Sequence, residues 1–325
     1  MSNLLSSMMT PAFFFSIIRI TSPILFATLG AVIVEKAGIS NIGLEGIMMI
    51  SALFGSLGAY YTSSWIVGLL VALAVGVLVA VIMSLFAFQL KTDIILVGIA
   101  INMIGSGGTL FLVKVITNLT EGKPLSSTTS LITKTLQIPT VNIPIIRSIP
   151  VLGKIISGHS LLTYVAFLMV FVVWVILYKT SLGLNLRSVG ENPNAASSVG
   201  VSVTKVRYIA MGLSGLMAGF GGAFMSMSYA MGWSQDMVAG RGFIALAAQA
   251  MSAEPLGSMF ATILFGFAQA FGIKLSSIGF DSNLASPIPY IITIVGLVIF
   301  AITKRSKEAK RLAAVGAAAE KEKEA

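Results

Sequence analysis

Long apolar runs recur along the chain and are separated by short polar segments. Runs of spanning length lie near 12–34, 43–62, 65–88, 93–115, 160–178, 207–231, 237–253, 256–274 and 284–303. Each is close to the ~20 residues that a helix needs to cross a bilayer. The pattern predicts an all-α fold, a polytopic transmembrane helical bundle of about nine spans, with about eight to ten as the range.

The charges support this interpretation because they avoid the apolar runs. Residues 46–90 contain no Asp, Glu, Lys or Arg. Only 10% of the chain is charged and 56% is hydrophobic, whereas an average soluble domain is about 25% charged. Composition therefore predicts a multi-pass membrane protein that is surrounded by lipid.

Glycine is spread through the predicted spans instead of marking turns. Lipid offers no hydrophobic drive for helix association, and small residues let two helix backbones approach closely. We therefore interpret the following glycines as packing faces: Gly55, Gly58, Gly105, Gly107, Gly108, Gly215, Gly219, Gly221 and Gly222.

The distribution of Lys and Arg predicts the domains and the orientation. Residues 1–303 form the transmembrane domain, and 304–325 form a charged tail that begins Lys304-Arg305. By the positive-inside rule this tail is cytoplasmic, which puts 179–206 on the same side and 116–160 outside. Nine spans place the N-terminus outside as well. The net charge of +9 thus reports membrane orientation and not nucleic-acid binding.

The inner segment 179–206 is more organised than a connector needs to be. Asn192 before Pro193 is a good helix start, because Asn caps and proline suits the first turn. A helix of about two turns over 194–199 would then end at Gly200. Two interpretations stand: a surface helix that joins two spans, or a helix that enters a groove on a soluble partner.

Most enzyme chemistry is excluded by composition. The chain has no cysteine and a single histidine, His159, which precedes a span and is interpreted as an interfacial residue. Thiol nucleophiles, disulfides and a histidine-based metal cluster cannot be built from these residues. No phosphate-binding loop of the form G-x-x-x-x-G-K-[ST] occurs either, because Gly122-Lys123 is followed by Pro and Gly153-Lys154 by Ile. The chain is predicted to be no enzyme and to contain no ATP site.

Four stretches resemble a known family. They are Ala-Gly-Ile-Ser-Asn-Ile-Gly-Leu-Glu-Gly (37–46), Ile-Pro-Val-Leu-Gly (149–153), Gly-Leu-Asn-Leu-Arg-Ser-Val-Gly-Glu-Asn-Pro (183–193) and Gly-Arg-Gly-Phe-Ile-Ala-Leu-Ala (240–247). The chain resembles the ABC importer permeases of the branched-chain amino acid, ribose and nucleoside superfamily over 20–303. The nucleoside or simple-sugar type is the most similar branch.

The resemblance implies several partners. Residues 190–200 resemble the coupling segment that docks on a separate ATPase subunit, which binds ATP and Mg, while this chain itself holds no cofactor. A second permease chain, related but different, and an extracytoplasmic solute-binding protein complete the importer. The implied coupling residues are Gly190, Glu191, Asn192, Pro193, Asn194, Ala195, Ala196 and Gly200. Of these, Ala195 and Ala196 are small enough for close approach to a groove.

Two segments suggest a transport path. Glu45 lies between glycines in Asn41-Ile-Gly-Leu-Glu-Gly46, and a charge at bilayer depth costs roughly 2.5–3.5 kcal/mol on insertion scales. Either a broken helix holds Glu45 beside the path, or Glu45 lies at the interface and is hydrated. Arg241 repeats this small–charged–small pattern with the opposite sign, but nothing in the sequence shows that the two meet.

Polar residues inside other spans are further candidates for the path. Together with Asn41 and Glu45 these are Asn102, Gln249 and Gln269. Each of the last three can instead form an interhelical hydrogen bond, which is the commoner use of a buried amide. We predict an importer subunit for a small polar solute, most simply a nucleoside. A simple sugar, riboflavin or branched-chain amino acid remains an alternative, as does an ion-coupled secondary transporter, although few carboxylates lie within the spans.

Overall fold

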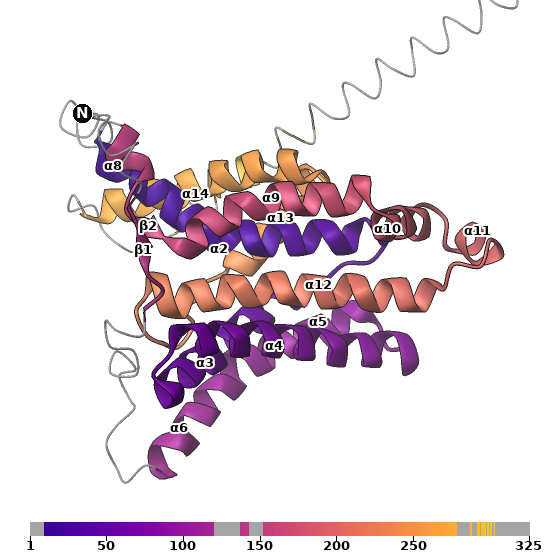
Figure 1. Cartoon of the computed structure of the whole chain (residues 1–325), viewed down its shortest axis with the longest axis horizontal. Coiled ribbons are helices and arrows are strands. Elements are labelled where there is room, and N and C mark those ends of the chain that lie inside the picture. The colour runs from indigo at the N-terminus through magenta and orange to yellow at the C-terminus, as the bar shows by residue number, and fades with distance from the viewer. Residues whose placement is uncertain are drawn as a thin grey trace, which may run out of the picture.

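A computed structural model of the chain describes residues 10–119, 137–142 and 152–277, with some single residues between 287 and 302. Long helices lie side by side and run between two ends of a bundle (Figure 1). A short hairpin of strands β1 and β2 lies at one end, and helices α10 and α11 lie at the other. We call these the β1–β2 end and the α11 end.

The helices follow the apolar runs closely. The long ones are α2 (Pro11–Glu35), α3 (Leu44–Thr62), α4 (Trp65–Ser84), α9 (Leu161–Lys179), α12 (Val203–Phe224) and α14 (Pro255–Ser277). The shorter ones are α5 (Ile94–Met103), α6 (Thr109–Leu119), α8 (Leu152–Ile156), α10 (Ser181–Glu191), α11 (Pro193–Ser198) and α13 (Arg241–Met251). π-helical turns at Leu85–Gln89 and Met225–Tyr229 extend α4 and α12, and one at Ile104–Gly108 joins α5 to α6. Strands β1 (Thr140–Val141) and β2 (His159–Ser160) pair antiparallel.

The nine predicted spans fall into three groups when they are compared with the structure. Among the described residues, seven helices are long and apolar enough to cross a membrane, and they match seven of the predicted runs. The prediction of a continuous span over 237–253 is wrong, because α13 has only 11 residues. The run at 284–303 lies mostly outside the described residues, as do the tail 304–325 and most of the loop 116–160. The count of nine therefore stays a prediction.

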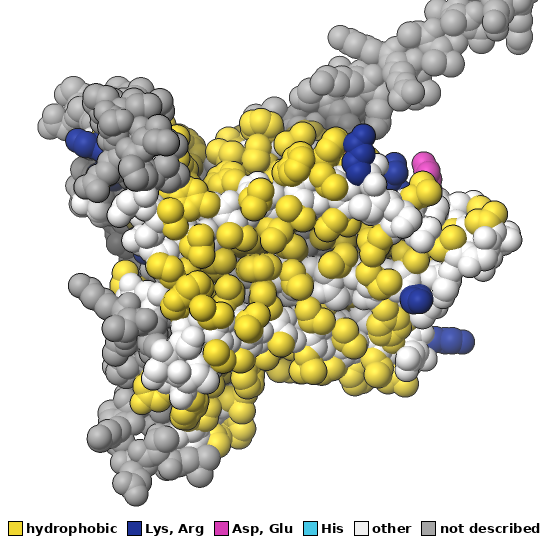
Figure 2. Space-filling view, viewed as in Figure 1, with side chains coloured by type: hydrophobic (Ala, Val, Ile, Leu, Met, Phe, Trp, Pro, Cys, Tyr) yellow, Lys and Arg dark blue, Asp and Glu magenta, His cyan; other side chains and the backbone are white. Residues whose placement is uncertain are grey.

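Three helices form the centre of the bundle. In their most apolar windows, 89% of α2 and 72% of α3 and α12 are buried, against 33% of α4 and α9. The outer helices turn large apolar side chains outward, among them Leu70, Phe111, Phe171 and Phe260. Figure 2 shows hydrophobic side chains covering the middle of one face, while Lys and Arg lie toward its ends. This surface suits lipid, because an exposed apolar area of this extent is unusual on a soluble monomer.

Glycines let the central helices touch backbone to backbone, as predicted for most of those singled out. A Cβ on Gly215 would overlap the carbonyl oxygen of Gly76, and one on Gly222 would overlap that of Met48. Gly105 faces Gly46 in the same way. Gly107 does not fit the prediction, since a Cβ there would have nothing within 4 Å.

Two segments without regular helix lead from the ends of the bundle toward its interior. Residues 36–43 connect α2 to α3, and residues 230–240 connect the end of α12 to α13. The second segment has positive φ at Met231, Asp236, Ala239 and Gly240, a conformation that bulky residues adopt rarely. Its side chains Trp233, Met237 and Val238 are buried. Irregular backbone at membrane depth is tolerated only where protein or a cavity surrounds it.

The two halves of the chain repeat one order of elements. A long helix, an irregular segment and two further helices occur as α2, 36–43, α3, α4 and again as α12, 230–240, α13, α14. Helices α2 and α12 run antiparallel, since Gly221 meets Pro23 while Gly30 meets Ser214. Gly76 of α4 packs on α12, and Thr262 of α14 packs on Thr28 of α2. Inverted repeats of this kind are common in transporters, with functional groups at the repeat interface.

Candidate functional site

The buried loop before α3 is fastened to the neighbouring helices by amide side chains. Asn41 donates through Nδ2 to Ser214 Oγ of α12 at 2.9 Å, and its Oδ1 accepts from the Gly43 N–H at 3.1 Å. Asn102 of α5 accepts from the Gly46 N–H at 2.8 Å and donates to the Ile42 carbonyl at 2.9 Å. The amides therefore satisfy backbone groups that the break in the helix leaves unpaired.

Glu45 joins the two irregular segments. Its Oε1 accepts the Gly240 N–H at 2.8 Å and its Oε2 accepts the Gly242 N–H at 2.6 Å. These donors lie at the N-terminus of α13, where the helix dipole and free N–H groups favour an anion. A Cβ on Gly242 would lie 2.6 Å from the Glu45 N, so only glycine fits there. Glu45 therefore lies at a break in the helix, held by backbone N–H groups, and its position beside a transport path stays a prediction.

Arg241 lies between Gly240 and Gly242, whose N–H groups bind the Glu45 carboxylate. Among the described residues, no hydrogen bond or ion pair joins the Arg241 guanidinium itself to Glu45. The side chain is buried, and Nη1 donates to the carbonyls of Met237 and Val238 at 3.3 and 3.0 Å. Its guanidinium also lies 5.2 Å from the centre of the Tyr229 ring, and Arg19 approaches the same ring at 5.0 Å. Carbonyls and an aromatic face thus stabilise both cations inside the bundle.

The proposed path residues do not form one cluster. Asn41, Glu45 and Asn102 meet around the start of α3. Gln249 is half-buried on α13, and Gln269 is buried on α14, where its Oε1 has no hydrogen-bond partner among the described residues. For Asn102 the interhelical hydrogen bond that the sequence left open is what the structure contains.

The α11 end contains the predicted short helix. Asn192 Oδ1 accepts from the N–H groups of Asn194 and Ala195 at 3.1 and 3.0 Å, and Pro193 is the first residue of α11. Gly200 follows with φ +89°, a conformation that glycine adopts without strain. The local helix is therefore explained by a side-chain cap, a proline start and a glycine stop.

The exposed surface of α11 differs from the prediction at one residue. Ala196 is 3% exposed and faces the chain's own interior, so the prediction that it approaches a partner's groove is wrong. Ala195 and Asn194 are exposed, as are Glu191 and Asn192, while Gly190 packs on the turn after α2. Val199 is 80% exposed and was missed, although an apolar residue in a small, polar loop is a detectable signal.

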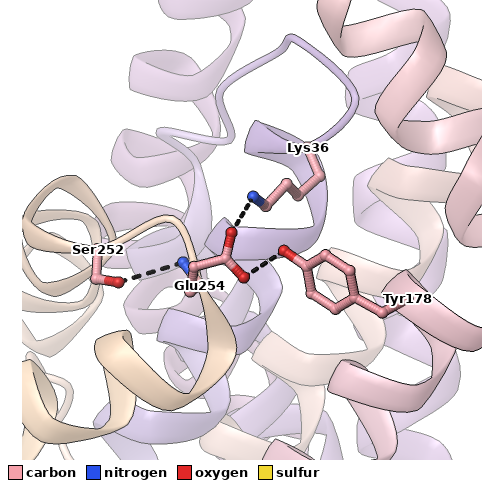
Figure 3. Close-up of polar contacts among 4 residues, drawn as sticks. All are labelled: Lys36, Tyr178, Ser252 and Glu254. Atoms are coloured by element: carbon pink, nitrogen blue, oxygen red, sulfur yellow. Dashed lines mark hydrogen bonds and ion pairs between the residues drawn. The ribbon is translucent and has the colours of Figure 1, made fainter.

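Sequence reasoning also missed a polar cluster beside α10. Lys36 Nζ lies 2.7 Å from Glu254 Oε1, and the Tyr178 hydroxyl donates to Glu254 Oε2 (Figure 3). Burial by itself lowers the pKa of Lys36, but its hydrogen bonds to Glu254 and Tyr178 outweigh burial and raise that pKa. For Glu254 burial raises the pKa, and hydrogen bonds from the same two groups bring it below its ordinary value. Both groups are therefore charged at neutral pH.

His159 is packed inside the protein just before α9, so its interfacial depth stays a prediction. It lies in β2, is 2% exposed and stacks on Phe15 with ring centres 3.8 Å apart. Burial lowers the pKa of its imidazole. Among the described residues, no group of three or more His, Cys, Asp or Glu could hold a metal ion.

Irregular segments that meet at the interface of an inverted repeat, within a bundle of membrane-spanning helices, are an arrangement typical of membrane transport proteins. Residues 13–307 match the model of the branched-chain amino acid transport system permease component family. The chain belongs to this family. Its relatives are integral membrane permease subunits of ABC transporters, so the chain is a multi-pass cell-membrane permease.

Individual relatives extend over most of the chain. The guanosine ABC transporter permease protein NupQ of Bacillus subtilis is 38% identical over 86% of this chain and 88% of its own length. The nucleoside ABC transporter permease protein NupC of Lactococcus lactis is 32% identical over 86% of this chain and 89% of its own. NupB of the same organism is 26% identical over 46% of this chain and 42% of its own. No solved structure matches the chain.

Proposed function

We propose that this chain is one membrane subunit of an ABC importer for nucleosides, and that a separate ATPase subunit docks on α11. The observation that carries the substrate class is the likeness to NupQ and NupC, whose names specify guanosine and nucleosides. The observation that carries the docking site is the exposed, capped helix at the α11 end.

The proposal also includes the remaining partners and the orientation. NupB and NupC are two different nucleoside permease proteins of one organism, which supports pairing of this chain with a second, related permease. A solute-binding protein would deliver the nucleoside at the β1–β2 end. ATP and Mg would be bound by the ATPase, since the sequence has no phosphate-binding loop of its own. The α11 end would then face the cytoplasm.

Uptake by the complete importer tests this function. Cells that lack other nucleoside importers would express the chain with its second permease, ATPase and binding protein, and take up labelled guanosine. We expect ATP-dependent uptake that excess unlabelled nucleoside suppresses and that excess ribose, riboflavin or leucine does not. Suppression by one of the latter solutes alone would contradict the nucleoside assignment. Uptake that persists when the ATPase gene is deleted would contradict the ABC mechanism.

A further inference from the structure

Glu254 lies where three parts of the bundle meet at the α11 end. It belongs to the connection between α13 and α14, whereas Lys36 follows α2 and Tyr178 belongs to the last turn of α9. Lys36 binds Oε1 of the Glu254 carboxylate, and the Tyr178 hydroxyl donates to Oε2. The Glu254 N–H donates to Ser252 Oγ at 3.3 Å. Arg187 of α10 covers the Tyr178 ring at 5.0 Å. The cluster therefore ties the end of α13 to α2, α9 and α10.

Helix α10 presses directly on the same cluster. A Cβ on Gly190 would overlap the carbonyl oxygen of Lys36, and a Cβ on Gly38 would lie 3.1 Å from the Gly190 Cα. Gly38 itself has φ +69°, which fixes the sharp turn. Because backbone meets backbone here, no flexible side chain can absorb a shift of α10. Only one residue, Glu191, separates Gly190 from Asn192, which caps α11.

The turn at 36–38 is connected to α13 by two routes, one along the chain and one through the Lys36–Glu254 ion pair. Residues 39–43 follow it, and α3 then presents Glu45 to the N-terminus of α13. The far end of α13 returns to Glu254, which binds Lys36. The contacts thus form a closed ring through α10, the 36–38 turn, Glu45, α13 and Glu254. Through these contacts α10, which leads into α11, is connected to both ends of α13.

We propose that Lys36, Glu254 and Gly190 form a coupling joint through which movement of α11 is passed to the half-helix α13. This inference rests on the proposed function, because the movement would come from the docked ATPase. Lys36, Glu254 and Gly190 are positioning residues, and they need not touch the solute. Energy can pass between distant sites through such contiguous packed and hydrogen-bonded contacts.

A simple stabilising role for the ion pair predicts a different result. The side chain of Glu254 is 53% exposed, and ion pairs this open to solvent add little to folding. Loss of the pair should therefore leave the amount of folded protein unchanged. A joint, by contrast, is recognised when ATP hydrolysis continues while transport falls.

The test uses the complete importer in lipid vesicles, with guanosine as the probe and the guanosine transported per ATP hydrolysed as the readout. Variants Lys36→Met, Glu254→Gln and the double variant are compared with Lys205→Met and Glu35→Gln. Lys205 and Glu35 are exposed at the same end and form no ion pair among the described residues. We expect each single change to lower the ratio at least about five-fold, the small end of allosteric couplings, with the double variant no lower than the singles. The controls should match wild type.

Each other outcome contradicts a specific statement. Ratios for Lys36→Met and Glu254→Gln within two-fold of wild type would overturn the joint, as would parallel loss of ATPase activity and transport. Multiplying effects in the double variant would show that the two side chains act separately, which also overturns it. If wild type itself shows no ATP-dependent guanosine uptake, the proposed function fails first and the joint fails with it.

Discussion

At the residue scale, the contact between Glu45 and the two glycines that flank Arg241 is the most constrained. Both carboxylate oxygens accept short hydrogen bonds from backbone N–H groups, and Gly242 lies against the Glu45 backbone of α3. A carboxylate that replaces the missing hydrogen-bond acceptors of a helix start stabilises that start only at close range. The site therefore depends on glycine at Gly242 as much as on Glu45.

Gly242→Ala should destabilise the permease, because its Cβ would overlap the Glu45 backbone. We expect a loss of about 1–3 kcal/mol, as for other overpacked sites, seen as a lower midpoint of thermal unfolding in detergent. Gly107→Ala is the matched control, since a Cβ there meets nothing within 4 Å. The midpoint for Gly107→Ala should not fall. An equal midpoint for Gly242→Ala and wild type would contradict the close contact.

The sequence predicted some of these residues and not others, for a physical reason. Glu45 is conspicuous because a charge beside an apolar run is costly, so its pattern made it a candidate, with a hydrated interface residue as the alternative. Its hydrogen-bond donor at Gly240 lies 195 positions away, and Glu254 lies 218 positions from Lys36. No local pattern reports such a pairing. Charges near span ends are common, so Lys36 and Glu254 carried no signal of their own.

At the scale of elements, length and apolar period identified the long helices but not the broken one. The run 237–253 is apolar enough for a span, yet Gly240 and the positive φ at Ala239 start the helix late. Helix α11 was predicted well because its start and stop use local chemistry: Asn192, Pro193 and Gly200. What remained hidden is which face of α11 points outward, since that depends on the packing of Ala196.

Val199→Asp should weaken docking of the ATPase on α11 and leave the permease folded. Val199 is 80% exposed, so a charge there costs the isolated chain little, whereas in an apolar groove it would be desolvated. We expect at least about a ten-fold loss of ATPase co-purified with tagged permease, about 1.4 kcal/mol. Permease abundance in the membrane should be unchanged.

Two further variants limit the interpretation. Ala196→Trp should lower permease abundance itself, because Ala196 is buried. Lys205→Gln, near the start of α12 at the same end, should behave as wild type. Normal co-purification by Val199→Asp would exclude the tip of α11 from the docking surface.

At the scale of the whole molecule, the orientation in the membrane can be tested directly because the chain has no cysteine. Single cysteines at Thr62 and Ser198 would lie at opposite ends of the bundle, and both positions are exposed. We expect Thr62→Cys to react with an impermeant thiol reagent in intact cells. Ser198→Cys should react only after the membrane is opened. The reverse pattern would invert the topology that the Lys and Arg distribution predicts.

The irregular segment at 230–240 affects how the protein enters the bilayer during synthesis. Helix α13 is about 16 Å long, roughly half of the hydrocarbon thickness, and its first N–H groups are satisfied by Glu45. On their own, residues 230–251 would expose unpaired backbone groups to lipid, which costs several kcal/mol for each group. Residues 230–251 therefore cannot be released into the membrane as an independent span. They can enter the bilayer only against α2 and α3, which are synthesised earlier and supply the Glu45 carboxylate.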